Sequence, residues 1–213
     1  MCESSEGSFT TRAISLESEK PEPNDGGNIF GKITVGSTTV DVTYTGSYYG
    51  FQLNGGTNYW ASDPSTYESS TASNAPSNSD IVPLNYGGSK TIAFSQPVQN
   101  PLIALVSWNG NNVSFANNPI EFLSYGAGYY GNGYPTLNST NTGFYGNGEL
   151  HGVVELPGTF TSITFTDSSE YWHGFSMGIV DLGQTTATPE PTSLLLLGSG
   201  PGLVGLVARR KMR

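Results

Sequence analysis

Hydrophobic and polar residues alternate along most of the chain from Ile29 onward. In the first stretch Ile33, Val35, Val40 and Val42 are separated mainly by Thr, Ser and Gly. This spacing predicts half-buried β-strands, because successive side chains of a strand point to opposite faces of a sheet. We expect strands near residues 33–44, 51–53, 81–84, 91–94, 102–108, 120–123, 153–156, 160–166 and 175–180.

Asn-Gly pairs lie between several of these stretches, at residues 54–55, 109–110, 132–133 and 147–148. Such pairs are typical of tight hairpin turns, which need positive φ angles. No stretch before residue 190 repeats hydrophobic residues with the 3.6-residue period of an amphipathic helix. Many short strands without helices predict an all-β fold, a jelly-roll-like β-sandwich.

The chain divides into three parts by composition. Residues 1–28 are acidic and polar, so we expect a disordered acidic leader. They contain no basic start followed by an apolar run, so no secretory signal peptide is visible, and we expect a misplaced start codon. The β-sandwich domain is expected at residues 29–186, and a tail with a short hydrophobic helix at residues 187–213.

A short internal repeat lies in the second half of the domain. Gly-Tyr-Tyr-Gly-Asn-Gly at residues 128–133 recurs as Gly-Phe-Tyr-Gly-Asn-Gly at residues 143–148. On a strand, one ring of each pair points inward and the other outward. Flat rings with amide side chains nearby can hold sugars, because the apolar ring faces stack and the amides bind hydroxyl groups. The candidate carbohydrate-binding residues are Tyr129, Tyr130, Tyr134, Phe144 and Tyr145.

Composition and charge exclude several protein classes. Charged residues are 12% of the chain, about half the usual ~25%, which excludes a coiled coil or helical bundle. The formal net charge is −9, and Lys32 and Lys90 are the only basic residues between Ile29 and Thr186. A nucleic-acid partner is excluded because no basic patch can neutralise phosphates. The single cysteine, Cys2, permits no intramolecular disulfide.

Three features follow one another in the tail. Pro189, Glu190 and Pro191 come first, an apolar stretch fills residues 194–208, and a basic cluster ends the chain. Fifteen helical residues span ~22 Å, less than the ~30 Å hydrocarbon core, so the stretch suits a transient membrane segment. The apolar side chains are Leu194, Leu195, Leu196, Leu197, Leu203, Val204, Leu206 and Val207, and the basic residues are Arg209, Arg210, Lys211 and Arg213.

This three-part tail resembles the PEP-CTERM sorting signal of Gram-negative bacteria, also catalogued as an ice-binding-protein C-terminal motif. The resemblance implies export, membrane passage through the tail, and exosortase as the processing partner. It also implies a final place at the cell surface or in the extracellular matrix, in association with exopolysaccharide or biofilm. Residues 80–181 resemble the poorly characterised sandwich domains that often precede this signal, a likeness that brings no catalytic residues.

Polar residues near the end of the domain offer three kinds of chemistry. Asp167 and Glu170 form an oxygen-rich corner between two strands and are candidate calcium ligands. Zinc would need both His151 and His173 together with a carboxylate. A glycosidase needs two carboxyl groups about 5–10 Å apart, and Glu149 would need a partner on another strand.

The sequence therefore favours an exported, non-catalytic protein that binds carbohydrate or adheres within extracellular polysaccharide. Two alternatives stay open. One is a glycan-active hydrolase or lyase on the same fold, and the other is a purely structural surface module stiffened by calcium.

Overall fold

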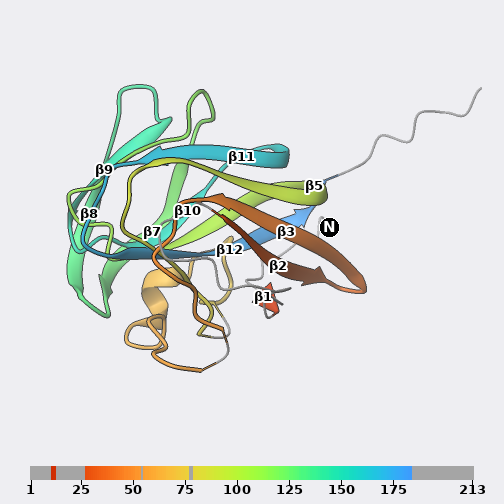
Figure 1. Ribbon diagram of the computed structural model, residues 1–213, viewed down its shortest axis with the longest axis horizontal. Coiled ribbons are helices and arrows are strands. Elements are labelled where there is room, and N and C mark those ends of the chain that lie inside the picture. The colour runs from red at the N-terminus through yellow and green to blue at the C-terminus, as the bar shows by residue number, and fades with distance from the viewer. Residues whose placement is uncertain (1–10, 13–26, 54, 77–78, 184–213) are drawn as a thin grey trace, which may run out of the picture.

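A computed structural model describes residues 11–12, 27–53, 55–76 and 79–183 (Figure 1). β-Strand is the dominant secondary structure of the described chain and helix is nearly absent from it, which confirms the all-β prediction. Pro64–Tyr67 forms a short 3₁₀ helix, η1. The strands are β1 Thr11–Arg12, β2 Gly27–Val35, β3 Thr38–Gly46, β4 Val82–Leu84, β5 Gly88–Val106, β6 Asn112–Ser114, β7 Glu121–Gly128, β8 Gly131–Leu137, β9 Gly143–Gly148, β10 His151–Glu155, β11 Thr159–Asp167 and β12 His173–Leu182.

All twelve strands belong to one continuous sheet that bends back on itself. The ring of pairings runs β5, β10, β7, β8, β9, β6 and β11, and β11 pairs again with β5. The long strand β5 connects two parts of this bent sheet. Its first half pairs with β3 and β11, and its second half pairs with β10 and β12. The stretches near 91–94 and 102–108, expected as two strands, are therefore parts of this one long strand.

The core fills the space inside this folded sheet. Trp108 lies at its centre, 1% exposed, with its ring near Phe144 and Phe165. The expected alternation is clear in β3, where Val40, Val42 and Tyr44 are buried. These inward side chains supply the apolar burial that stabilises the domain.

A second, smaller cluster covers the opposite face of β5 and β10. Trp60 and Tyr67, from the segment around η1, pack there against Ala104, Val106 and Val153. β10 is consequently buried on both faces, from His151 to Glu155. This segment forms the loops below the sheet in Figure 1.

Residues 109–148 differ most from expectation, because β6, β8 and β9 lie where the sequence favoured turns. The two copies of the repeat also differ. In the first, Tyr129 and Tyr130 form the turn between β7 and β8, and the Asn-Gly pair lies inside β8. The second copy is strand β9 throughout, and its Asn-Gly pair ends the strand.

The predicted tail lies outside the described residues, including its sorting signal, its hydrophobic helix and its basic end. Of the expected leader, Thr11 and Arg12 form β1, which pairs with β2. No helix in the described ranges has the length and apolar character needed to cross a membrane.

Candidate functional site

Four aromatic rings from three distant segments meet at the surface: Tyr59, Tyr129, Tyr130 and Trp172. We call them the aromatic cluster. The ring centroids of Tyr59 and Tyr130 lie 5.9 Å apart in a stacked arrangement, and those of Tyr130 and Trp172 lie 5.2 Å apart. The Tyr129 ring meets Tyr59 and Tyr130 edge-on, at 5.0 and 4.9 Å. Such pairs are attractive beyond their buried area, so the rings hold one another in place.

The cluster remains open to solvent. Tyr129 is 47% exposed and Tyr130 is 46% exposed, whereas Tyr59 and Trp172 are half-buried beneath them. Burial, followed by a hydrogen bond with Tyr59, raises the pKa of Tyr130 to about 12, so its hydroxyl stays protonated at neutral pH. The cluster thus offers a part-apolar surface edged by hydroxyl groups.

The β7–β8 turn explains why both tyrosines are exposed. Gly128 and Gly131 pair with each other, and the two tyrosines between them form a two-residue turn. Gly131 has a φ of +141°, which a side chain rarely adopts. The inward–outward alternation expected for these rings applies on a strand, and a turn does not follow it.

Two carboxyl groups lie beside the aromatic cluster and bind the same residue, Asn109. Its backbone N–H donates to Glu170 Oε1 at 2.9 Å, and its side-chain Nδ2 donates to Glu149 Oε1 at 2.8 Å. Their two acceptor oxygens therefore lie within about 10 Å of each other, given standard covalent geometry. This is the cross-strand carboxyl pair that the sequence left open for Glu149.

The bend after β5 places Asn109 between these carboxylates. Ser107 has a φ of +59°, a left-handed conformation that is uncommon outside glycine. Its Oγ donates a hydrogen bond to Glu149 Oε2. Asn111 then binds the neighbouring loop, because its Nδ2 donates to the Ser168 carbonyl at 2.9 Å. These contacts fix the loop that presents Asn109 to solvent.

Contacts connect the carboxyl pair with the aromatic cluster. The side chain of Glu149 passes close to Gly131, where an added Cβ would lie 3.3 Å from Glu149 Cγ. Gly131 follows Tyr130 directly, and Trp172 is two residues beyond Glu170. Glu149 therefore lies beside the turn that carries Tyr129 and Tyr130, and Asn109 links Glu149 to Glu170.

Glu170 has an unusual ionisation for a carboxyl group. Its pKa is raised to about 7, mainly by burial and also by the nearby charges of Glu149 and Asp167, against hydrogen bonds from Asn109 and Asn111 that lower it. His173 Nδ1 lies 3.3 Å from Glu170 Oε2. Burial is the largest cause that lowers the pKa of His173. Near neutral pH, Glu170 thus exists in both protonation states.

Asp167 binds a cation that the protein itself supplies. Its Oδ1 forms an ion pair with Lys90, and its Oδ2 lies 3.0 Å from His173 Nε2, with all three side chains fully buried. These contacts do not fit the expected calcium site at Asp167 and Glu170. His173 lies between the two carboxylates, and the Lys90 ammonium takes the position beside Asp167 that a metal would need.

Among the described residues, no group of three or more His, Cys, Asp and Glu side chains could hold a metal ion. The two histidines contact different partners. His151 Nδ1 lies 3.1 Å from the hydroxyl of Tyr67, whereas His173 contacts Asp167. Burial lowers the pKa of His151 to about 4, so it is neutral at physiological pH. The zinc alternative gains no support from this arrangement.

The other candidate sugar-binding residues lie elsewhere. Phe144 is 3% exposed and packs in the core against Trp108 and Phe122, so its inclusion was wrong. Tyr145 is exposed on the opposite side of β9 and makes no ring contact recorded within the described ranges. Tyr134 lines a shallow groove with Tyr125 between β7 and β8. Tyr59 and Trp172 were not among the candidates, because only folding places them beside the turn.

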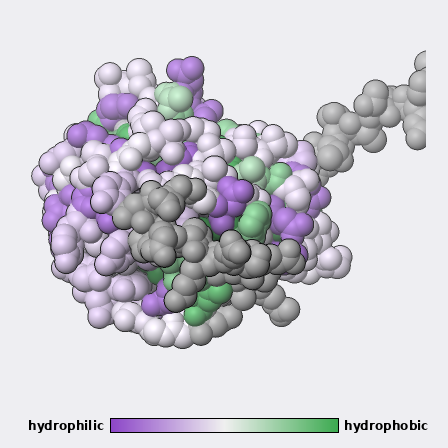
Figure 2. All heavy atoms as spheres, in the orientation of Figure 1, coloured by the Kyte–Doolittle hydropathy of each residue, from purple (hydrophilic) through white to green (hydrophobic). Residues whose placement is uncertain are grey.

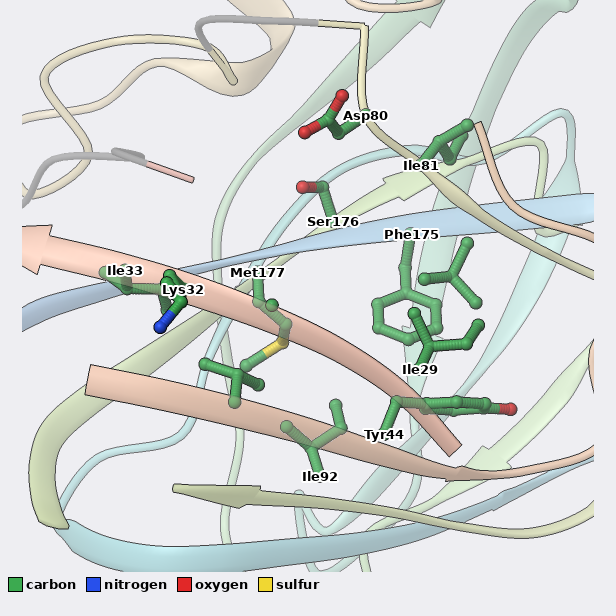
Figure 3. A pocket seen from close by; sticks show the side chains of 13 residues that line it. Ile29, Lys32, Ile33, Tyr44, Asp80, Ile81, Ile92, Phe175, Ser176 and Met177 are labelled. Carbon is green, nitrogen blue, oxygen red and sulfur yellow. The ribbon is translucent and has the colours of Figure 1, made fainter. Parts of the chain in front are cut away.

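A small apolar pocket lies apart from the aromatic cluster. Figure 3 shows an apolar pocket between the β2–β3 hairpin and β12, lined by Ile29, Tyr44, Phe175 and Met177. Its volume of about 50 Å³ is well below the ~150 Å³ cavity that admits benzene, so it is too small for a sugar ring. The face in Figure 2 is mostly hydrophilic, with hydrophobic residues only in small patches.

Comparison with known families identifies the C-terminal end. Residues 187–211 match the PEP-CTERM protein-sorting motif. The chain carries an exosortase sorting signal. The PEP-CTERM signal implies export and sorting during membrane transit in a Gram-negative bacterium. Neither curated proteins nor solved structures gave a significant match to the chain.

Proposed function

We propose that the β domain of this exosortase-sorted protein is a glycan-binding module that acts at the cell surface or in the extracellular matrix. The aromatic cluster carries the proposal. Four rings from distant segments converge at the surface, and two of them are about half exposed. Natural proteins seldom gather aromatic rings at the surface without a ligand or partner to cover them.

The chemistry of the surface suits a sugar. The apolar C–H face of a pyranose ring can lie on a tyrosine or tryptophan ring, which offers a large apolar area with a polar edge. Glu149, Glu170 and Asn109 stand next to the rings, and each has hydrogen-bonding capacity left for hydroxyl groups. Sorting through an exosortase would bring such a module to the place where exopolysaccharide accumulates.

Binding without cleavage is the function proposed here, and glycan cleavage is the second candidate. The shared hydrogen bonds of Glu149 and Glu170 to Asn109 favour this second candidate, since hydrolysis uses two carboxyl groups of differing protonation. Incubating polysaccharide with the protein and measuring new reducing ends separates the two. Retention without new reducing ends supports a binding module.

Retention of the full chain on immobilised polysaccharides tests the proposal. We expect Tyr130→Ala and Trp172→Ala each to weaken retention strongly, because each removes a ring at the centre of the cluster. Phe30→Ala is the matched control, since Phe30 is an aromatic residue of similar exposure (41%) on β2. If the cluster variants and the control all bind like the wild type, the aromatic cluster is not the binding site.

A further inference from the structure

We propose that the site selects glycan chains that carry free amino groups, and that it holds the ammonium group beside Glu149 and Glu170 while the sugar ring rests on the aromatic cluster. This inference rests on the proposed glycan-binding function. It goes further by naming the chemical class of the ligand.

The two carboxylates have unused hydrogen-bond acceptor positions that a cation could occupy. Each carboxylate oxygen can accept two hydrogen bonds. The described contacts to Glu149 come from Ser107 and from Asn109 Nδ2, and those to Glu170 from the Asn109 N–H and Asn111. Both oxygens of Glu149 and Oε1 of Glu170 therefore keep acceptor capacity, whereas Glu170 Oε2 already faces Asn111 and His173. An ammonium group donates three hydrogen bonds and accepts none, so it complements this pair better than a hydroxyl group does.

The aromatic cluster adds a second attraction for a cation. A positive charge over a tyrosine or tryptophan face is attracted by the electrons of the ring. Glu149 lies close enough to Tyr130 for its charge to help raise the pKa of that tyrosine. An amino sugar stacked on Tyr130 or Trp172 would thus carry its ammonium group toward the carboxylates.

The surroundings of His173 indicate independently that Glu170 lacks a fully charged cationic partner. Its imidazole is fully buried, and its Nδ1 makes no hydrogen bond although it lies 3.3 Å from Glu170 Oε2. Its other nitrogen, Nε2, already contacts Asp167. Lys90 is close to Asp167, whereas no lysine or arginine of the described residues forms an ion pair with Glu170. An ammonium group from a ligand would supply the missing charge.

The charge of the whole domain favours the same class of ligand. Residues 27–183 contain ten Asp and Glu residues and two lysines. Lys90 is buried with Asp167, and Lys32 is paired with Asp41 at 2.9 Å, so neither is available to attract an anion. The resulting field repels glycans rich in carboxylate or sulfate groups and attracts cationic ones, most strongly at low salt.

The test compares two oligomers that differ only at the nitrogen. Calorimetry of the full chain would use β-1,4-linked glucosamine oligomers and their fully N-acetylated counterparts of equal length. We expect the free amine form to bind at least about tenfold more tightly at low salt, the effect of roughly one favourable charge interaction. That preference should shrink when salt is added.

Carboxylate variants locate the ammonium group. Glu149→Gln and Glu170→Gln are expected to weaken binding of the amine form much more than binding of the N-acetylated form, so that the preference for the amine falls. Glu68→Gln is the matched control, because Glu68 is an exposed carboxylate on the segment after η1. Should a variant fail to fold by circular dichroism, the wild-type comparison of the two oligomers still decides the proposal.

The outcomes separate this inference from the proposed function. Equal binding of the two oligomers would overturn the selection for amines and leave glycan binding intact. An amine preference that both carboxylate variants retain would place the ammonium group elsewhere and also contradict the inference. If neither oligomer nor any other polysaccharide is retained, the proposed function fails as well.

Discussion

The ammonium group of Lys90 and the carboxylate of Asp167 form an ion pair in which neither side chain is exposed to solvent. Lys90 lies on β5 and Asp167 at the end of β11, two strands that pair with each other. Lys90 Nζ also donates to the backbone carbonyl of Tyr86 at 2.9 Å, and His173 contacts the other oxygen of Asp167. Both buried charges thus have several partners, as a low-dielectric interior requires.

Lys90→Met should destabilise the domain by about 3–5 kcal/mol, because it leaves Asp167 buried without its cation. Chemical denaturation with tryptophan fluorescence measures the change. The double variant Lys90→Met/Asp167→Asn should recover part of the loss, since it also removes the uncompensated charge.

Lys32→Ala is the control for this prediction. The Lys32–Asp41 pair, with Nζ 2.9 Å from Oδ1, lies at the surface, with side chains 52% and 64% exposed. Its loss should cost about 0–1 kcal/mol. Similar losses for the two lysine variants would show that burial does not strengthen the Lys90 pair.

Glu170 should make stability depend on pH. Its pKa is raised from 4.5 to about 7 in the folded state, so the folded protein holds the proton more tightly than the unfolded chain. The resulting contribution to stability is fully present below about pH 4.5 and is lost as pH rises toward and through about 7.

Thermal unfolding of wild type and Glu170→Gln across this pH range measures the effect. The pKa of His151 is lowered to about 4, so acidification makes the folded protein less stable through this residue, the opposite of the effect of Glu170. The two proteins must therefore be compared at each pH. The stability of the wild type relative to Glu170→Gln should fall as pH rises. A constant difference would contradict the raised pKa.

Phe144 and Tyr145 should respond in opposite ways although they are adjacent. Phe144→Ala removes a buried ring between Trp108 and Phe122 and should cost about 3–5 kcal/mol. Tyr145 is 41% exposed on the other face of β9, so Tyr145→Ala should change stability by about 0.5 kcal/mol or less. Urea unfolding of both variants checks the prediction. Equal effects would contradict the orientation of β9.

Gly128 allows the β7–β8 turn to approach His151 closely. A Cβ added at Gly128 would lie 2.4 Å from His151 Cγ, and this imidazole is fully buried. Gly128→Ala should therefore cost about 1–3 kcal/mol through overpacking. Gly50→Ala, with no atom within 4 Å of the new Cβ, serves as the control and should be close to neutral in a thermal melt.

Strong alternation allowed several strands to be predicted from the sequence. β3 and β11 were found because β-branched and aromatic residues repeat every second position. β8 and β9 were missed because Gly, Asn and Pro dominate them, and these residues have low intrinsic preference for strands. Their pairing with each other and with β6 offsets that preference.

The amino-acid sequence alone was enough to predict the all-β class, the acidic charge of the domain and the sorting signal at residues 187–211. These depend on local periodicity, total charge and residue order, which do not change on folding. Only the tertiary structure decided which aromatic rings and carboxylates meet. Tyr59 and Trp172 join Tyr130, and Glu149 meets Glu170 through Asn109, because the folded sheet brings distant loops together at one place. Contacts between residues so far apart leave no periodic signal in the chain.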